Sequence, residues 1–131
     1  MHYAVLIDSH AHAQFAAYDA DRDGVMRRAL ESGVGIINVG TLFSTSLAAV
    51  RLAEKYKDGV WATVGFHPSH TAPSAHHDVW EAREPNSSNF DIADFGEIAR
   101  HPKVVAIGEC GLDYYRLEGD AAAVKEKQKQ V

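Results

Sequence analysis

The stretch "VVAIGECGLDYY", residues 104–115, decides how the rest of the chain is interpreted. It begins as a continuous run of apolar and β-branched residues, which is typical of a strand that is buried on both faces. It then changes abruptly to a polar segment that contains Glu109 and Asp113. A buried strand that ends in two carboxylates indicates a functional site at that end of the strand.

Three more apolar runs precede this one. They are residues 3–8 (YAVLID), 34–39 (VGIINV) and 60–64 (VWATV). Four predicted helices alternate with the runs, and the first covers residues 23–31. The second is capped by Ser44 or Thr45 and has Ala49, Leu52, Ala53 and Tyr56 on one face. The third is marked by Ile92, Phe95 and Ala99, and the fourth begins after Asp120. Because continuous apolar strands are buried on both faces, this β-α-β-α-β-α-β-α order predicts an α/β fold with a parallel sheet and helices outside it.

Composition sets the class of protein. With 131 residues, of which 46% are hydrophobic and 24% charged, the chain fits one soluble globular domain over residues 1–131. A net charge of −5 without a basic tract argues against a nucleic-acid binder of the usual basic kind. The absence of a long apolar span or leader predicts a cytoplasmic protein with no membrane partner. The polar segment 69–89 predicts a long surface loop, and such loops are often functional.

The first candidate site lies in "IDSHAHA", where Asp8, His10 and His12 are spaced by two residues. On an extended chain this spacing places all three side chains on the same side. Two imidazoles in this arrangement can bind one divalent ion, and the aspartate can orient a neighbouring ligand. The alternative is that one histidine caps a loop and the other is solvated. The pair follows a predicted parallel strand, at the end where α/β proteins build their sites, and this favours the metal site.

The other strands end in a similar way. The second runs into Asn38 and Thr41, the third into His67, and the fourth into Glu109. Glu109 is the natural oxygen donor to complete a site begun by the two histidines of the first strand, and a carboxylate can also bridge two ions. The alternative is an ion pair between Glu109 and Arg116 or Lys103 at the entrance of a loop.

Two further features favour simpler interpretations. Cys110 lies next to Glu109, but no base is adjacent in sequence, so we expect a small hydrophobic residue in a packed strand end. The loop histidines His70, His76 and His77 are expected to be solvated.

The motifs "DSHAHA", "GIINVGT", "ATVGFHP" and "VVAIGECGLDYYR", in this order, resemble the TatD family of metal-dependent deoxyribonucleases, which are amidohydrolase-like TIM barrels. The resemblance covers nearly the whole chain. It implies a fold of eight βα units and a site with two divalent ions, Mg, Mn or Zn. By match to the family motifs, the ligands of one ion are His10 and His12. By the same resemblance, Glu109 would be the shared or bridging ligand, and His67 would contact the substrate phosphate or the water held by the metal.

Two aspartates complete the predicted site. Asp8 and Asp113 are expected to support the metal ligands or to contact substrate. The resemblance implies that the family's remaining ligands, two histidines and an aspartate, come from later strands, for which this sequence has no positions. One ion at most is therefore expected to be well held by this chain.

The chain is short for the implied fold. A full TIM barrel takes about 250 residues, whereas this sequence reaches Val131 within its fourth predicted helix. We therefore expect the first half of a TIM-type barrel, with two exposed edge strands, that needs a missing C-terminal half or a partner chain. The complete enzyme would cleave DNA phosphodiester bonds in the 3′-5′ direction, and the chain alone would be inactive. The alternatives are an amidohydrolase-like enzyme acting on amides, esters or lactones, and a non-catalytic fragment.

Overall fold

The computed structural model describes residues 6–72, 79–82, 90–115, 117 and 119–131. The strands are β1 (Leu6–Ala11), β2 (Val34–Asn38), β3 (Val60–Val64) and β4 (Val104–Ile107), and the α-helices are α1 (Arg22–Glu31), α2 (Phe43–Glu54), α3 (Ile92–Ile98) and α4 (Ala121–Gln130). Two short 3-10 helices, η1 (Ala16–Tyr18) and η2 (Pro68–Thr71), follow β1 and β3. The strands and the α-helices alternate along the chain as predicted.

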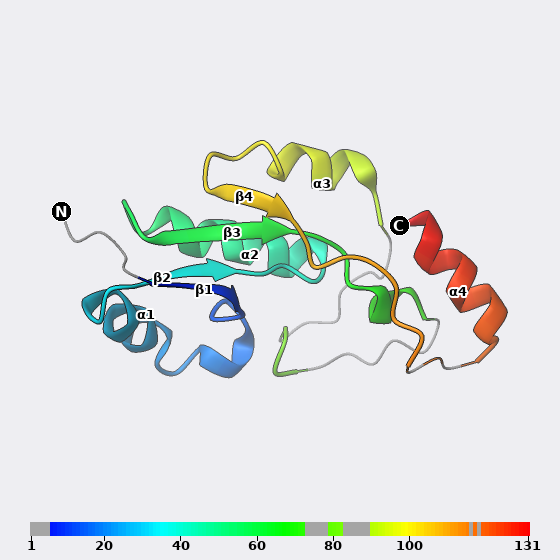
Figure 1. The fold of residues 1–131 in the computed structure, drawn as a ribbon, viewed down its shortest axis with the longest axis horizontal. Coiled ribbons are helices and arrows are strands. Elements are labelled where there is room, and N and C mark those ends of the chain that lie inside the picture. The colour runs from blue at the N-terminus through cyan, green and yellow to red at the C-terminus, as the bar shows by residue number, and fades with distance from the viewer. Residues whose placement is uncertain (1–5, 73–78, 83–89, 116, 118) are drawn as a thin grey trace.

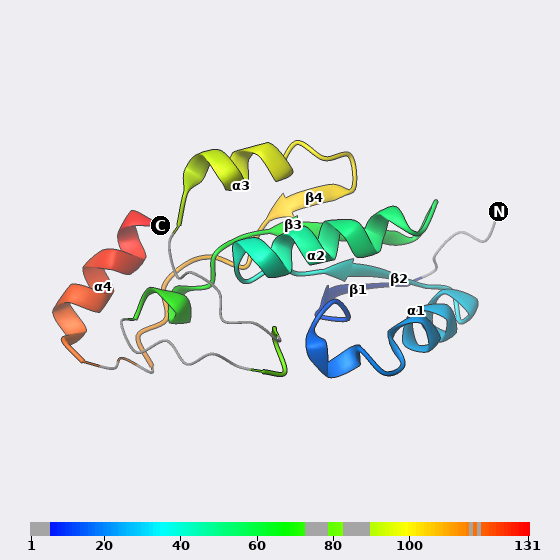
Figure 2. The same ribbon diagram turned by 180° about the vertical axis from the view of Figure 1, so that it is seen from behind.

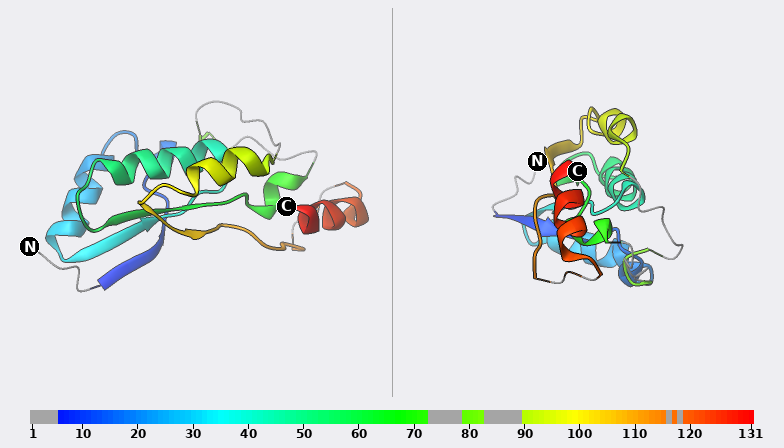
Figure 3. Two further views of the ribbon diagram at one scale, coloured as in Figure 1. Left: turned by 90° about the horizontal axis from the view of Figure 1, so that it is seen from above. Right: turned by 90° about the vertical axis from the view of Figure 1, so that its right-hand side faces the viewer.

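The strands form one parallel sheet in the order β1-β2-β3-β4 (Figure 1). Helix α2 lies in front of the sheet in Figure 2, and α2 and α3 lie on the same side of it in Figure 3. The first and last strands each have a neighbour on one side only, which confirms the two expected edges. Their apolar side chains are exposed, by 67% at Leu6, 55% at Ile7, 50% at Val105 and 66% at Ile107. The prediction that every strand is buried on both faces is therefore wrong for these two.

The core lies between the sheet and α2. Ala49, Leu52 and Ala53 are buried on one face of this helix, as their spacing predicted, and they belong to the same cluster as Val60 and Val64 of β3. Glycine is needed at one point of this contact, because a Cβ on Gly40 would lie 2.2 Å from the hydroxyl of Ser46. The helix can approach the sheet closely there.

The predicted cap of α2 is wrong. The helix begins at Phe43, so Ser44 and Thr45 both lie inside its first turn. Thr45 reaches back, and its hydroxyl accepts hydrogen bonds from the N–H groups of Leu42 at 2.8 Å and Thr41 at 2.9 Å. The hydroxyl thus satisfies free N–H groups from a position within the helix instead of from the residue before it.

Helix α4 begins as predicted. The carboxylate of Asp120 accepts hydrogen bonds from the N–H groups of Ala122 at 2.9 Å and Ala123 at 3.3 Å. Near the other end, the Gln128 side chain donates to the carbonyl of Pro68 in η2 at 3.4 Å. None of the described helices combines the length and apolarity that a membrane crossing requires.

The predicted long loop is described only in part. Residues 3–5 of the first apolar run, residues 73–78 and 83–89 of the loop, including His76 and His77, and Arg116 lie outside the described residues. The short segment 79–82 binds back to η1, where Ala17 N–H donates to the carbonyl of Trp80 at 2.8 Å and Ala16 N–H to that of Glu81 at 3.2 Å. This contact brings Glu81 close to the ends of the strands.

Candidate metal centre

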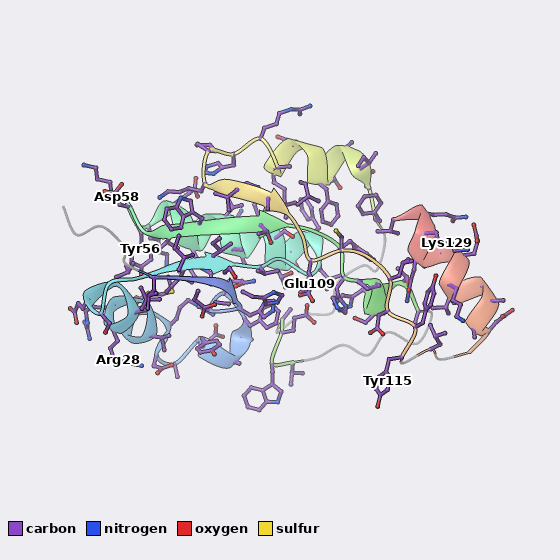
Figure 4. The ribbon with its side chains drawn as sticks, viewed as in Figure 1. Arg28, Tyr56, Asp58, Glu109, Tyr115 and Lys129 are labelled. Carbon is purple, nitrogen blue, oxygen red and sulfur yellow. The ribbon has the colours of Figure 1, made fainter. Side chains whose placement is uncertain are left out.

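Glu109 reaches the site because the chain crosses the end of β3 directly after β4. Gly108 N–H donates to the carbonyl of Val64 at 2.9 Å, and Glu109 N–H donates to that of Gly40 at 2.8 Å. The crossing passes over Gly65, where a Cβ would lie 2.3 Å from the carbonyl carbon of Gly108 and 2.5 Å from the nitrogen of Glu109. Any larger residue at position 65 would therefore push Glu109 out of place. Figure 4 shows the Glu109 side chain where the carboxyl ends of the strands meet.

His10 lies near the end of β1, on the other edge of the sheet, and His12 directly follows this strand. Asp8 supports this end of the strand, since its carboxylate accepts a hydrogen bond from the N–H of His10 at 3.1 Å. The Nδ1 atom of His12 lies 2.9 Å from the carbonyl of Val39. A carbonyl only accepts, so Nδ1 of His12 carries the hydrogen and Nε2 keeps a free lone pair, which is the arrangement of a metal-binding histidine. The ring of His12 also stacks on Phe15 at 4.4 Å.

Three side chains converge at one point. Oε2 of Glu109 lies 3.4 Å from Nε2 of His10 and 3.9 Å from Nε2 of His12. The donor atoms of the three residues all lie within 4.8 Å of one another, and no second such group of three occurs in the described part of the chain. Ligands of a tetrahedral ion with bonds of about 2.1 Å are about 3.4 Å apart, so this donor set fits one divalent ion.

Of the two alternative partners of Glu109, Lys103 does not compete for it. Lys103, which could have formed an ion pair with it, donates its Nζ to the carbonyls of Tyr56 at 2.6 Å and Lys57 at 3.0 Å. Arg116 lies outside the described residues. Within the described part of the chain, the carboxylate of Glu109 faces histidines only.

His67 differs chemically from His12. Its Nε2 lies 3.3 Å from the second oxygen of Glu109. Its Nδ1 accepts a hydrogen bond from the backbone N–H of Ser69 at 3.1 Å. A neutral His67 therefore carries its hydrogen on Nε2, where it donates toward Glu109, instead of offering a lone pair to an ion. The geometry gives His67 the role of a hydrogen-bond donor beside the metal ligands.

Asp113 is not brought to this cluster. Its carboxylate accepts a hydrogen bond from the N–H of Tyr115 at 2.9 Å. Its own N–H and carbonyl are bonded to the side chain of Gln128 in α4, at 3.0 Å and 2.9 Å. In the described part of the chain, Asp113 thus joins the segment after β4 to α4.

A second polar cluster was not predicted. Glu81, whose side chain is only 13% exposed, lies 3.3 Å from Nε2 of His70 and accepts a hydrogen bond from the hydroxyl of Thr41. Burial alone would raise the pKa of Glu81, but the hydrogen bonds from His70 and Thr41 and the electrostatic interactions with His70 and His12 hold this pKa below its usual value. The expectation that His70 is solvated is therefore wrong. No periodic pattern marks Glu81 in the sequence, because it lies within the long polar segment 69–89.

Cys110 also differs from the prediction. Its side chain is exposed instead of packed in the strand end. The reason is that β4 ends at Ile107, and the chain has already left the sheet where Cys110 follows.

Comparison with known proteins agrees with this architecture. A family model described as "TatD related DNase" matches residues 7–131. A "3'-5' ssDNA/RNA exonuclease TatD" from Erwinia tasmaniensis is 39% identical over 101 residues, which are 76% of this chain and 34% of that protein. An "uncharacterized metal-dependent hydrolase YabD" from Bacillus subtilis is 37% identical over 112 residues, or 85% of this chain and 38% of that protein. The chain thus spans little more than a third of the length of these relatives.

A solved structure supports the fold. The crystal structure of YjjV, a TatD homolog from Escherichia coli K12, superposes with a TM-score of 0.63 at 28% sequence identity. The match covers 99% of this chain and 47% of YjjV. The prediction of parallel βα units that form the first half of a TIM-type barrel is confirmed. The chain belongs to the TatD related DNase family.

Proposed function

We propose that this chain supplies the first half of the active site of a metal-dependent nuclease that cleaves single-stranded DNA from its 3′ end. The observation that carries the proposal is the convergence of His10, His12 and Glu109 from opposite edges of the sheet. Relatives that share this half of the fold are named as 3′-5′ exonucleases. Such ligands can hold an ion that activates water and polarises a phosphoryl oxygen.

We assign the ligands of one divalent ion to His10, His12 and Glu109. The two imidazoles favour zinc over magnesium, which prefers oxygen ligands, and the carboxylate also suits manganese. A second ion would share Glu109 and would need further ligands that the described residues do not provide. When bound, such ions polarise a phosphoryl oxygen and lower the pKa of water, so that it attacks at neutral pH.

The remaining residues position these groups. Asp8 holds the backbone at His10, and the carbonyl of Val39 fixes the ring of His12. His67, with its hydrogen on Nε2, would donate to a phosphate oxygen that approaches Glu109. A donor placed where negative charge increases stabilises the transition state of phosphoryl transfer.

We further propose that residues 1–131 form part of one barrel domain. Strands β1 and β4 expose their apolar side chains, and such edges are normally covered by further strands. Additional βα units, from the same protein or from a partner chain, would close the barrel and complete the ligand set.

A chimeric barrel tests this function directly. Residues 7–131 would replace the corresponding region of the Erwinia tasmaniensis relative, and degradation of 3′-labelled and 5′-labelled single-stranded DNA would be followed with Mn²⁺. The expected result is loss of the 3′ label first. Glu109→Gln should reduce turnover at least about 100-fold, since loss of groups that merely orient metal ligands already costs about 10–100-fold in affinity or activity. A chimera that cleaves small esters but not DNA would contradict the proposal and favour the amidohydrolase-like alternative.

A further inference from the structure

A groove runs along α2, outside the cluster of His10, His12 and Glu109. Two adjoining cavities form it, with volumes of about 310 and 230 Å³. Both are lined by Gln14, which follows β1, and by Ser44 and Ala48 of α2. Figure 2 shows this helix in front of the sheet. The smaller cavity reaches Glu81, so the groove begins beside the strand ends and extends away from them along the helix.

Two buried polar atoms in this groove lack partners. Gln14 is 8% exposed, and its Nε2 donates to the carbonyl of Val39 at 2.7 Å. Its Oε1 has no hydrogen-bond partner, and neither has the buried hydroxyl of Ser44. Of the three buried side-chain atoms without a partner in the described part of the chain, two thus line the same groove. Buried polar groups are nearly always hydrogen-bonded in native proteins, so this pair points to a ligand that supplies the partners.

The larger cavity is cationic. It is lined by Arg22, Arg51 and Lys55, and no acidic residue lines it. Arg22 is engaged by Asp19 at 2.7 Å and by backbone carbonyls. Arg51 lies in the last turn of α2 and Lys55 directly follows the end of the helix. Both are exposed and form no ion pair among the residues that the structure describes. Two uncompensated cations in a chain of net charge −5 mark a place for an anion.

The groove has the chemistry and size for a nucleotide chain. We propose that it binds single-stranded nucleic acid, as a subsite of the proposed nuclease, on which this inference rests. Arg51 and Lys55 bind backbone phosphates. A base N–H or a sugar hydroxyl donates to Oε1 of Gln14, and the hydroxyl of Ser44, in the first turn of α2, donates to a phosphate oxygen. A cavity of about 310 Å³ is at the small end of the usual range for bound organic molecules, about 300–1,000 Å³, and suits about one nucleotide.

Binding without metal separates this subsite from the metal centre. The chain would be titrated into a fluorescein-labelled single-stranded oligonucleotide of about eight residues, in EDTA, with anisotropy as the readout. In the variant Arg51→Gln/Lys55→Gln, the slope of log affinity against log salt concentration should become less steep by about 1.4, because each phosphate contact contributes about 0.7 for a single strand. The matched control is Arg27→Gln/Lys57→Gln, which removes the same charge from exposed positions outside the groove and should keep the wild-type slope.

Ser44→Ala tests the buried hydroxyl. It should weaken oligonucleotide binding about two- to tenfold, the usual value of one hydrogen bond, and leave the salt slope unchanged. Since this hydroxyl has no partner in the protein, the unfolding temperature of the free chain should not decrease. Equal slopes for the groove variant and its control, wild-type affinity in Ser44→Ala, or no binding by the wild-type chain at 50 mM salt would each overturn the proposal.

The variant His10→Ala/His12→Ala distinguishes the two proposals. It should lose metal binding in calorimetry but bind the oligonucleotide in EDTA like the wild type. If the wild-type chain binds the oligonucleotide but takes up no metal, the nuclease assignment would be overturned and the proposed nucleic-acid subsite in the groove would be supported.

Discussion

Replacing Glu109 by glutamine should abolish tight metal binding while leaving the fold intact. The two side chains have the same shape, but the glutamine amide is neutral and keeps only one oxygen. In the structure both oxygens of Glu109 are used: Oε2 lies 3.4 Å from His10 Nε2, and Oε1 lies 3.3 Å from His67 Nε2. The substitution therefore removes the negative charge and one acceptor from the centre of the cluster.

The size of the effect follows from the position of Glu109. Mutation of groups that merely orient metal ligands costs about 10–100-fold in affinity, so loss of a direct ligand should cost at least about 100-fold. The unfolding free energy without metal should change by less than about 1 kcal/mol, because the Glu109 side chain is 31% exposed and solvent weakens its contacts with the histidines.

Calorimetric titration with Zn²⁺ and Mn²⁺ measures the loss in affinity, and thermal unfolding gives an independent value. At an ion concentration of about 100 Kd the wild type should be stabilised by about 2.7 kcal/mol, and a variant with 100-fold weaker binding by only about 0.4 kcal/mol. The matched control is Glu126→Gln on α4, which removes an exposed carboxylate that pairs with Lys129 at 3.2 Å. Equal dissociation constants for Glu109→Gln and the wild type would refute the assignment, and so would an equal loss in the control.

Three further outcomes are expected. The chain alone should degrade single-stranded DNA with Mg²⁺ or Mn²⁺ no faster than its His10→Ala/His12→Ala variant; faster turnover would mean that association completes the site or that its own ligands suffice. Its exposed edge strands should make it associate in sedimentation velocity, and Ile107→Lys should reduce that association, whereas a wild-type monomer at all concentrations would contradict this. Glu81→Gln should lower the unfolding free energy by about 1–3 kcal/mol at pH 7. Because the folded-state pKa of Glu81 is lowered, this stabilisation is complete above the usual value of 4.5 and is lost as pH falls through the folded value. Urea unfolding should show the difference shrinking below pH 4.5, and a constant difference down to pH 3 would count against it.

The sequence predicted those parts of the fold that depend on local patterns. The third apolar run became β3 (Val60–Val64) with the predicted bounds, and Asp120 caps α4 as expected. The start of α2 was misplaced because the hydroxyl of Thr45 can serve the free N–H groups from inside the first turn. A serine or threonine in the sequence indicates a helix start, but it does not show whether the residue precedes the helix or lies within its first turn.

The candidate site was predictable in its members but not in its geometry. The spacing of His10 and His12 and the position of Glu109 after a strand were visible in the sequence. The position of the hydrogen on His12 depends on the carbonyl of Val39, which is far from it in the sequence. The position of the hydrogen on His67 depends on the local turn that brings the N–H of Ser69 to its ring, and the sequence alone does not show that turn. The exposed strand edges, in contrast, followed from the implied fold.

The ligands converge from the two edge strands of the sheet. Adjacent strands lie about 4.8 Å apart, so in a flat sheet β1 and β4 would be separated by about 14 Å. The observed 3.4 Å between His10 Nε2 and Glu109 Oε2 is reached because the two side chains extend toward each other and because the crossing over Gly65 carries Glu109 toward Gly40. Both features lie within these four βα units. The strands that would complete the barrel are thus needed to cover the apolar side chains of β1 and β4 and to bring further ligands, but not to bring His10, His12 and Glu109 together.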